Sequence, residues 1–300
     1  MDIALHLGAN LTDDSQLRTC LIANEVLLAR QDILVQRPRK FLDPCLTAAH
    51  EIAEMAPDLK EAREALGTAH RKTVLDAAEV DANTRRLILS SPALLAKLSQ
   101  SFDGARLYPQ AGARMAALRD VFAGHRISLY LAVRNPASFV PALLTAVKAS
   151  VRDEILGNMS KAPLNWFDVI QDIRKSWPEA SLTLWADEDT PFIWDRAVRA
   201  VAGCNPESEL KGLQSWYDTI LVPGAADKLD AFIRSAPPLN TTLRHRTISA
   251  FLDKYCDFDK LDVDVSITGW NERHVEMLSH VYEEDLGRFA ALDDVTFLQP

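Results

Sequence analysis

The chain has 300 residues, with 33 basic and 42 acidic side chains, a formal net charge of −9 and 48% apolar residues. This composition is close to that of soluble globular proteins and excludes disordered, collagen-like and low-complexity chains. The negative net charge disfavours nucleic acid as a partner, because the overall field repels phosphate. The four cysteines form no CxxC pair and no cluster with zinc spacing, so we predict no metal site.

Single, scattered cysteines are typical of a reducing compartment. The first residues, MDIALHLG, have no basic region and no cleavage-like site of the kind that a signal peptide has. The longest apolar runs, such as Ile127–Val133, are far shorter than the roughly 20 residues that span a bilayer. We therefore expect a cytoplasmic protein with no membrane span.

The chain opens with a predicted strand, a loop and a helix. Ile3–Leu7 is short and apolar and ends at Gly8, which is typical of a buried strand. Between Leu17 and Leu28, apolar residues recur at helical spacing. The loop that joins the two elements follows the carboxyl end of the strand, where open parallel sheets bind their ligands.

Helices and strands alternate over the following residues. We expect helical character from about residue 40 to 85, then strands at residues 86–91, Ile127–Val133 and Ser181–Ala186, and helices at residues 112–122, 137–152, 166–177 and 192–201. Beyond Gly224 the pattern is mostly helical, with long segments near residues 228–233, 242–255 and 270–290. The alternation predicts an α/β fold with three layers, in which helices cover both faces of a parallel sheet. We expect one domain over residues 1–300, of which residues 225–300 are the mainly helical C-terminal part.

Four segments of the chain carry a family resemblance. The loop His6–Ser15, read HLGANLTDDS, resembles the first loop of bacterial sulfotransferases, which commonly reads His-x-Gly-x-x-Lys-Thr-Gly-Thr-Thr/Ser. Tyr130–Pro136, read YLAVRNP, resembles their strand that ends in Arg-x-Pro. Leu182–Asp189, read LTLWADED, resembles their later strand that ends in Tyr-Glu-Asp, and the amphipathic stretch Trp166–Pro178 matches the helix before it.

This resemblance implies a P-loop-like fold and the cofactor 3′-phosphoadenosine 5′-phosphosulfate. In the family, the first loop holds the phosphosulfate at a helix N-terminus, and the arginine of the second motif holds the 3′-phosphate together with a serine. The positions implied for cofactor binding are Gly8, Thr12, Asp13, Asp14, Ser15 and Arg134. The motifs assign no catalytic residue and no general base.

The departures from the family pattern fall on the phosphate contacts. The position of the motif lysine holds Leu11, the positions of the Gly-Thr pair hold Asp13 and Asp14, and the serine expected eight residues after Arg134 is Ala142. Catalysis of sulfuryl or phosphoryl transfer depends on fixed positive charge beside the developing anion. Two like charges 4 Å apart repel by about 1 kcal/mol even in water. The acidic loop therefore argues against tight binding of the sulfate donor.

Asp13 and Asp14 admit other interpretations. Asp13-Asp14-Ser15-Gln16 has the form of a capping box, in which Asp13 caps the helix and Gln16 reaches back. Alternatively, the two carboxylates hold Mg²⁺ that bridges to a nucleotide phosphate.

Arg134, which ends one predicted strand, and the acids Glu188 and Asp189, which follow another, also admit two interpretations each. Arg134 either contacts a bound anion or forms an ion pair with Glu188 or Asp189. Glu188 and Asp189 could supply a base or a metal ligand, but Asp189 precedes Thr190-Pro191, which favours capping of the next helix. We interpret His6 as a histidine of the core.

We carry two main hypotheses of function. In the first, the chain is a diverged sulfotransferase-like protein with weak or no binding of the sulfate donor, which acts as a binding or regulatory protein for a small anion, nucleotide or glycan. In the second, it is an active sulfotransferase whose rebuilt loop is assisted by a cation such as Arg244 or Arg246. Binding of a different nucleotide or carbohydrate in the same crevice is a third possibility, which only the fold supports.

Overall fold

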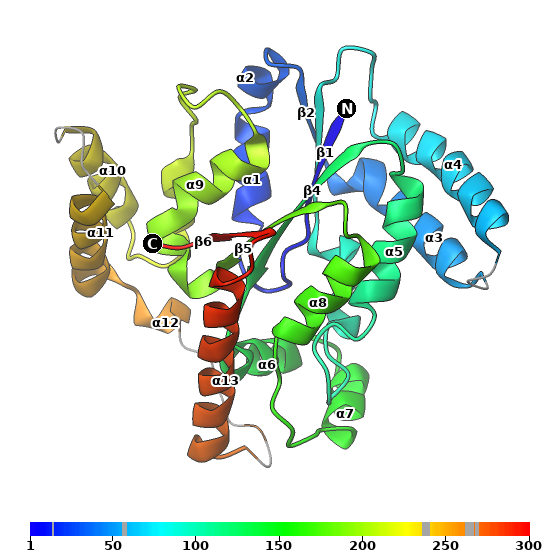
Figure 1. Ribbon diagram of the computed structural model, residues 1–300. Coiled ribbons are helices and arrows are strands. Elements are labelled where there is room, and N and C mark those ends of the chain that lie inside the picture. Colours follow the sequence, from blue (N-terminus) through cyan, green and yellow to red (C-terminus); the bar gives the residue numbers. More distant parts are fainter. Residues whose placement is uncertain (14, 56–58, 236–240, 262–266, 268–269) are drawn as a thin grey trace.

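A six-stranded parallel sheet lies at the centre of the part of the chain that the structure describes (Figure 1). The computed structural model describes residues 1–13, 15–55, 59–235, 241–261, 267 and 270–300. The strands are β1 (Asp2–His6), β2 (Ile33–Gln36), β3 (Arg86–Ser90), β4 (Arg126–Val133), β5 (Ser181–Ala186) and β6 (Val295–Leu298). They lie in the order β2-β3-β1-β4-β5-β6, and each neighbouring pair is parallel. The predicted α/β fold is confirmed.

Helices cover both faces of the sheet. One face packs against α3 (Pro38–Ala53), α5 (Ala111–Val121), α6 (Pro136–Ala146), α8 (Phe167–Ser176) and α13 (Glu272–Ala290). The other face packs against α1 (Gln16–Ala23), α2 (Glu25–Ala29) and α9 (Thr190–Ala202), and α10 (Ala225–Ser235) and α11 (Thr241–Tyr255) extend that layer. The remaining helices are α4 (Lys60–Ala77), α7 (Ala149–Gly157) and α12 (Phe258–Leu261). Helix α4 packs on α3 and α5. Short 3-10 helices η1 (Pro92–Leu94), η2 (Leu98–Gln100), η3 (Asp187–Asp189) and η4 (Leu213–Thr219) lie in the connections.

The burial of the strands explains their continuous apolar sequence. In β1, Ile3 and Leu5 face one core and Ala4 faces the other, so all three side chains are buried. A strand enclosed on both faces needs apolar residues at every position rather than at alternate ones. The same pattern made β3 and β4 recognisable in the sequence, whereas β5 was predicted from the alternation of its residues.

The structure adds two strands that the sequence analysis does not predict. Ile33–Gln36 forms β2 at one edge of the sheet, and Val295–Leu298 forms β6 at the other. The second lies in the part predicted to be mainly helical. Each has four residues, so neither is long enough to establish a period of its own.

The sheet order places β1 between β3 and β4. After β1 the chain enters α1 on one face, whereas after β4 it enters α6 on the opposite face. Connections that leave neighbouring strands toward opposite faces open a crevice at the carboxyl ends of the strands. The loop Gly8–Ser15 begins at this point.

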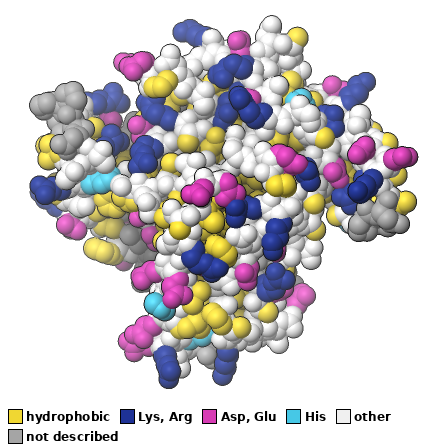
Figure 2. All heavy atoms as spheres, viewed as in Figure 1, with side chains coloured by type: hydrophobic (Ala, Val, Ile, Leu, Met, Phe, Trp, Pro, Cys, Tyr) yellow, Lys and Arg dark blue, Asp and Glu magenta, His cyan; other side chains and the backbone are white. Residues whose placement is uncertain are grey.

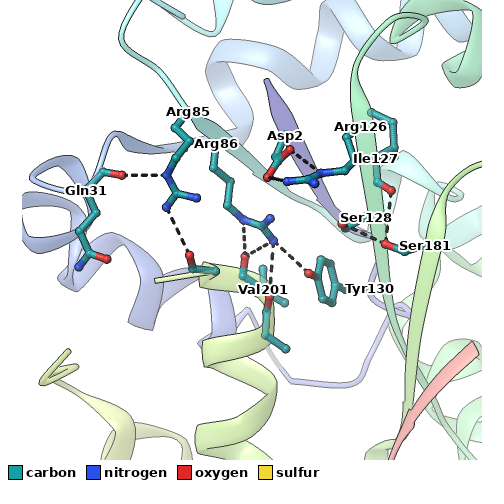
Figure 3. A network of polar contacts seen from close by, with 12 residues as sticks. Asp2, Gln31, Arg85, Arg86, Arg126, Ile127, Ser128, Tyr130, Ser181 and Val201 are labelled. Atoms are coloured by element: carbon teal, nitrogen blue, oxygen red, sulfur yellow. Dashed lines mark hydrogen bonds and ion pairs between the residues drawn. The ribbon is translucent and has the colours of Figure 1, made fainter. Parts of the chain in front are cut away.

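At the amino ends of the strands, opposite this loop, Arg86 is buried beside the end of α9 (Figure 3). Its side chain is 7% exposed and donates hydrogen bonds to the carbonyl oxygen of Val201 (3.0 Å) and to the hydroxyl of Tyr130 (3.0 Å). The last carbonyls of a helix carry partial negative charge, so they stabilise the buried guanidinium. Gly203 ends α9 at φ +59°, and a Cβ there would lie 2.7 Å from Nε of Arg86.

Asp285 of α13 joins the C-terminal part to the start of α8. The side chain is 1% exposed and accepts hydrogen bonds from the backbone N–H groups of Trp166 (2.6 Å) and Phe167 (3.1 Å). These amides have no partner within their own helix, so an acceptor from α13 satisfies them. Burial raises the pKa of Asp285, and the two backbone donors act against that rise.

The surface mixes charges of both signs. On the face shown in Figure 2, Lys and Arg side chains alternate with Asp and Glu instead of gathering into one patch. Within the described ranges, no helix combines the length and the apolarity needed to cross a membrane.

Candidate functional site

The loop after β1 is held against its neighbours by backbone contacts. The N–H groups of Leu7 and Ala9 donate to the carbonyl oxygens of Tyr130 (2.8 Å) and Ala132 (2.9 Å), so the loop continues alongside β4. Gly8 has φ +95°, and a Cβ there would lie 2.7 Å from Cβ of Pro92. Only glycine fits this position, because it tolerates positive φ and has no Cβ.

The next part of the loop is tied to buried side chains and to itself. The backbone N–H of Asn10 donates to the hydroxyl of Tyr108 at 2.8 Å, and the Asn10 amide group donates to the carbonyl of Ala96 at 3.2 Å. The hydroxyl of Thr12 donates to the carbonyl of Ala9 at 3.0 Å. Asn10 and Tyr108 are both buried. These contacts tie the loop to the body of the protein and to itself.

Asp13 provides the acceptors for the start of α1. Its carboxylate accepts hydrogen bonds from the N–H groups of Ser15 (3.2 Å) and Leu17 (2.7 Å), and its carbonyl accepts from the N–H of Gln16 (2.7 Å). The Asp13 side chain therefore caps the first amides of α1, but the predicted capping box with Asp13 as the N-cap is wrong. Ser15, not Asp13, is the residue directly before the helix, and its side chain makes no capping bond. In the described residues, the Gln16 side chain makes no return bond to Asp13, because the helix begins later than the capping box requires. Asp14 lies outside the described residues.

Arg134, at the end of β4, contacts the loop. Its guanidinium donates to the carbonyl of Leu11 (2.5 Å) and to the hydroxyl of Ser138 (3.1 Å). The carbonyl of Arg134 accepts from the indole N–H of Trp166 at 2.7 Å. Leu11, where the sequence resemblance leads us to expect a lysine, is partly buried and packs against the core. The structure thus brings together the loop and Arg134.

Glu188 does not form the predicted ion pair with Arg134. Its two oxygens accept from the backbone N–H of Asn135 (2.9 Å) and from the hydroxyl of Tyr282 (2.6 Å). These donors come from the end of β4 and from α13. Burial, with the negative charge of Glu188 as a smaller cause, raises the pKa of Tyr282.

Asp189 precedes α9, but its side chain makes no capping hydrogen bond, so the predicted cap is wrong. Pro191 already occupies the first turn of that helix, where it removes one N–H donor. Burial and the charge of Glu188 raise the pKa of Asp189.

His6 is a core residue, as its apolar neighbours suggest. It is 3% exposed, its Nδ1 lies 2.8 Å from Oγ of Ser90 in a hydrogen bond, and its ring stacks on Trp185 with centroids 6.0 Å apart. Burial lowers the pKa of His6, the positive charge of Arg18 lowers it further, and the charge of Asp13 opposes both. The ring is therefore neutral at pH 7.

Sequence reasoning missed several residues that shape this site. Asn10, Tyr108, Ser138 and Trp166 hold the loop or Arg134 in place. Tyr108 is 98 positions from Asn10 in the sequence, so no local pattern could have paired them. Ser138 lies four residues after Arg134 and could have been found, because that spacing places both near one helix start.

The candidate binding residues now have positions. Gly8, Thr12, Asp13 and Ser15 lie in one loop, and Arg134 lies beside it. Their role in binding a cofactor stays a prediction. Among the described residues, no three His, Cys, Asp or Glu side chains are placed to share a metal ion.

The fold and this loop define an α/β protein whose candidate site lies at the carboxyl ends of a parallel sheet. Comparison with known proteins adds no relative: no family model matches the chain, and no curated protein or solved structure is detectably similar to it.

Proposed function

We propose that the chain is a diverged sulfotransferase-like protein that has lost productive binding of the sulfate donor and acts as a binding or regulatory protein. The observation that carries this proposal is the carboxylate of Asp13, which is hydrogen-bonded to the N–H groups of Ser15 and Leu17. In a P-loop-like protein, amides at this helix N-terminus would bind the anion. Here a negative charge of the protein itself takes them.

The architecture supports the family part of the proposal. The first strand is central in the sheet, its loop opens a helix, and an arginine at the end of the neighbouring strand β4 reaches that loop. Each of these features agrees with the order of the sulfotransferase-like motifs. The support is one of arrangement, since a fold can serve many functions.

The residues present do not fit 3′-phosphoadenosine 5′-phosphosulfate. Leu11 offers no cation, and its side chain packs against the core. Six N–H groups of the loop and the start of α1 already have acceptors within the protein. They belong to Leu7, Ala9, Asn10, Ser15, Gln16 and Leu17. A donor phosphate would have to displace Asp13 and would then lie beside its charge, a repulsion of about 1 kcal/mol in water and several-fold more near a protein surface.

An active sulfotransferase is the second candidate, because Arg134 is only partly buried and lies against the loop. A cation from α11 gives this candidate little help. Arg244 lines a cavity formed with α9, η4 and α10, and no loop residue belongs to that lining.

Calorimetric titration with the sulfate donor and with adenosine 3′,5′-bisphosphate tests the proposal. We expect dissociation constants weaker than about 1 mM for both. Micromolar binding of either compound overturns the proposal. Radiolabelled sulfate transfer to glycan and small-molecule acceptors then tests the second candidate, for which the Arg134→Ala variant must abolish transfer. Asp13→Asn is the matched variant for the first experiment, because it keeps an oxygen acceptor for the amides and removes the charge.

A further inference from the structure

A second hollow lies away from the loop, among the helices on one side of the sheet. A cavity of about 390 Å³ is bounded by residues of α9, η4, α10 and α11. Figure 1 shows α9, α10 and α11 on one side of the sheet. Small-molecule sites have volumes from about 300 to 1,000 Å³ and are lined mostly by apolar and aromatic side chains. This cavity is at the lower end of that range.

The cavity has an apolar part: half of its lining residues are apolar or aromatic, and the other half carry charged or amide side chains. Trp194 and Tyr217 supply aromatic surface, and Leu213, Leu229 and Ile233 supply aliphatic surface. The hydroxyl of Tyr217 donates to the carbonyl of Pro191 at 2.6 Å, so it is already committed within the protein. This part of the lining therefore suits the hydrocarbon or aryl body of a ligand.

Trp194 of this lining carries an unsatisfied donor. It is 3% exposed, and within the described ranges its buried indole N–H has no hydrogen-bond acceptor. Buried polar groups without a partner are rare in native proteins and call for a specific explanation. The indole N–H itself is closed to solvent, so the contribution of Trp194 to the cavity is its apolar ring surface.

The charged side chains of the lining are mostly neutralised by one another. Asp195 pairs with Arg199 at 2.8 Å, and Asp230 pairs with Arg234 at 2.9 Å. Arg199 also donates from Nη1 to the carbonyl oxygens of Pro206 (3.1 Å) and Ser208 (3.0 Å), so its Nε and Nη1 groups are engaged within the protein. Neither pair leaves a net charge for a ligand.

Two charged lining residues differ from these pairs. Across the described part of the chain, the side chains of Arg244 and Glu209 have no ion pair or hydrogen bond. Glu209 is exposed to water, whereas Arg244 is half-buried. Burial raises the pKa of Tyr217 to about 12, and the positive charge of Arg244 acts against that rise. Arg244 is therefore the charge that a bound ligand would meet inside the cavity.

We propose that this cavity binds a small monocarboxylic acid with an apolar body, whose carboxylate pairs with Arg244 and whose body lies between Trp194, Tyr217 and the aliphatic side chains. A guanidinium binds a carboxylate through two parallel hydrogen bonds, which gives both affinity and orientation. The site is independent of the loop Gly8–Ser15. It gives the proposed binding protein a ligand class, and it can be correct even where the loop proposal fails.

Titration of the full chain with decanoate and with 2-naphthoate, followed by calorimetry and by tryptophan fluorescence, tests the proposal. We expect saturable micromolar binding of at least one acid, with a change in fluorescence that Trp194→Phe reduces. Decan-1-ol, which lacks the charge, and decylammonium, which reverses it, should bind at least about tenfold more weakly. Absence of saturable binding up to about 1 mM overturns the proposal.

Two variants test the contact itself. Arg244→Met should weaken binding by about tenfold or more, since it removes a charge-assisted pair but keeps the apolar stem. The control is Arg246→Met, two residues away on the same helix, exposed and outside the lining. Glu209→Gln should leave binding unchanged or strengthen it. Equal losses of affinity in Arg244→Met and Arg246→Met contradict the proposal. A loss of affinity in Glu209→Gln as large as that in Arg244→Met also contradicts it, because the ligand would then carry a positive charge as well as a negative one. The titrations with the sulfate donor test the proposed function, and the titrations with carboxylic acids test the cavity. Each proposal can therefore fail independently of the other.

Discussion

The carboxylate of Asp13 lies 2.7 Å from the backbone nitrogen of Leu17, and this hydrogen bond places a negative charge of the protein at the N-terminus of α1. Asp13→Ala removes the acceptor for two amides. We expect a loss of about 1 kcal/mol in the free energy of unfolding, the usual effect of losing a cap. Urea denaturation measures it. Asp13→Asn keeps an acceptor and should lose less. If the alanine variant is as stable as the parent, the capping role is wrong.

Arg134 has a structural role that can be separated from any ligand. Arg134→Ala leaves the carbonyl of Leu11 without its donor and removes the bond to Ser138. We expect a loss of about 1–2 kcal/mol in the free energy of unfolding. The matched control is Arg246→Ala, which changes an exposed arginine and should cost less than about 0.5 kcal/mol. Similar losses in both variants would show that the contacts of Arg134 contribute nothing measurable.

Asp285 should be among the most sensitive positions in the chain. Asp285→Ala deprives the N–H groups of Trp166 and Phe167 of their acceptor in a buried place, so we expect a loss of about 2–4 kcal/mol. Arg288 pairs with the same carboxylate at 3.4 Å but is exposed, and Arg288→Ala should cost less than about 1 kcal/mol. Thermal and urea denaturation give both values. A larger loss for Arg288→Ala would reverse this assignment.

Arg86 and Gly203 should be coupled in stability. Arg86→Met leaves carbonyls at the end of α9 without donors, with an expected loss of about 2–3 kcal/mol. Gly203→Ala adds a Cβ at φ +59°, 2.7 Å from Arg86 Nε, with an expected loss of about 1–2 kcal/mol. Because the new Cβ meets the Arg86 side chain, the double variant should lose less than the sum. Strict additivity in the double-mutant cycle would contradict the contact.

His6 gives the fold a dependence on pH. Burial lowers its pKa, so the unfolded chain binds a proton more readily than the folded chain does. Stability is therefore complete above the ordinary histidine pKa of about 6.5 and falls as the pH decreases below it, toward the lowered value. Unfolding free energies of the parent and of His6→Gln, measured between pH 7 and pH 5, should converge as the pH falls. Parallel curves would exclude this role for His6.

The sequence predicted what is local and missed what depends on distant parts of the chain. The apolar run Ile127–Val133 predicted β4, because a strand buried on both faces must be apolar throughout. By contrast, the four residues of β6 are only partly buried, and the strand exists because β5 lies beside them. No local pattern encodes such a pairing.

The candidate site divides in the same way. Asp13 as a cap follows from the residues that surround it, since a carboxylate two to four positions before free amides can reach them. The sequence could not predict the hydrogen bond that the guanidinium of Arg134 donates to the carbonyl oxygen of Leu11. It requires β1 and β4 to be neighbours, which is a property of the sheet order.

The bond from Trp166 to Asp285 sets an order of events during synthesis. The start of α8 lacks its acceptor until a residue 119 positions later in the chain is available, and the edge of β5 stays open until Val295–Leu298 pairs with it. A nascent chain that has passed α8 but not α13 presents free amides and an unpaired strand edge, which other chains can contact. Folding of this sheet is completed only by its last strand, so shortening the chain before residue 285 should yield a protein that aggregates rather than a smaller domain.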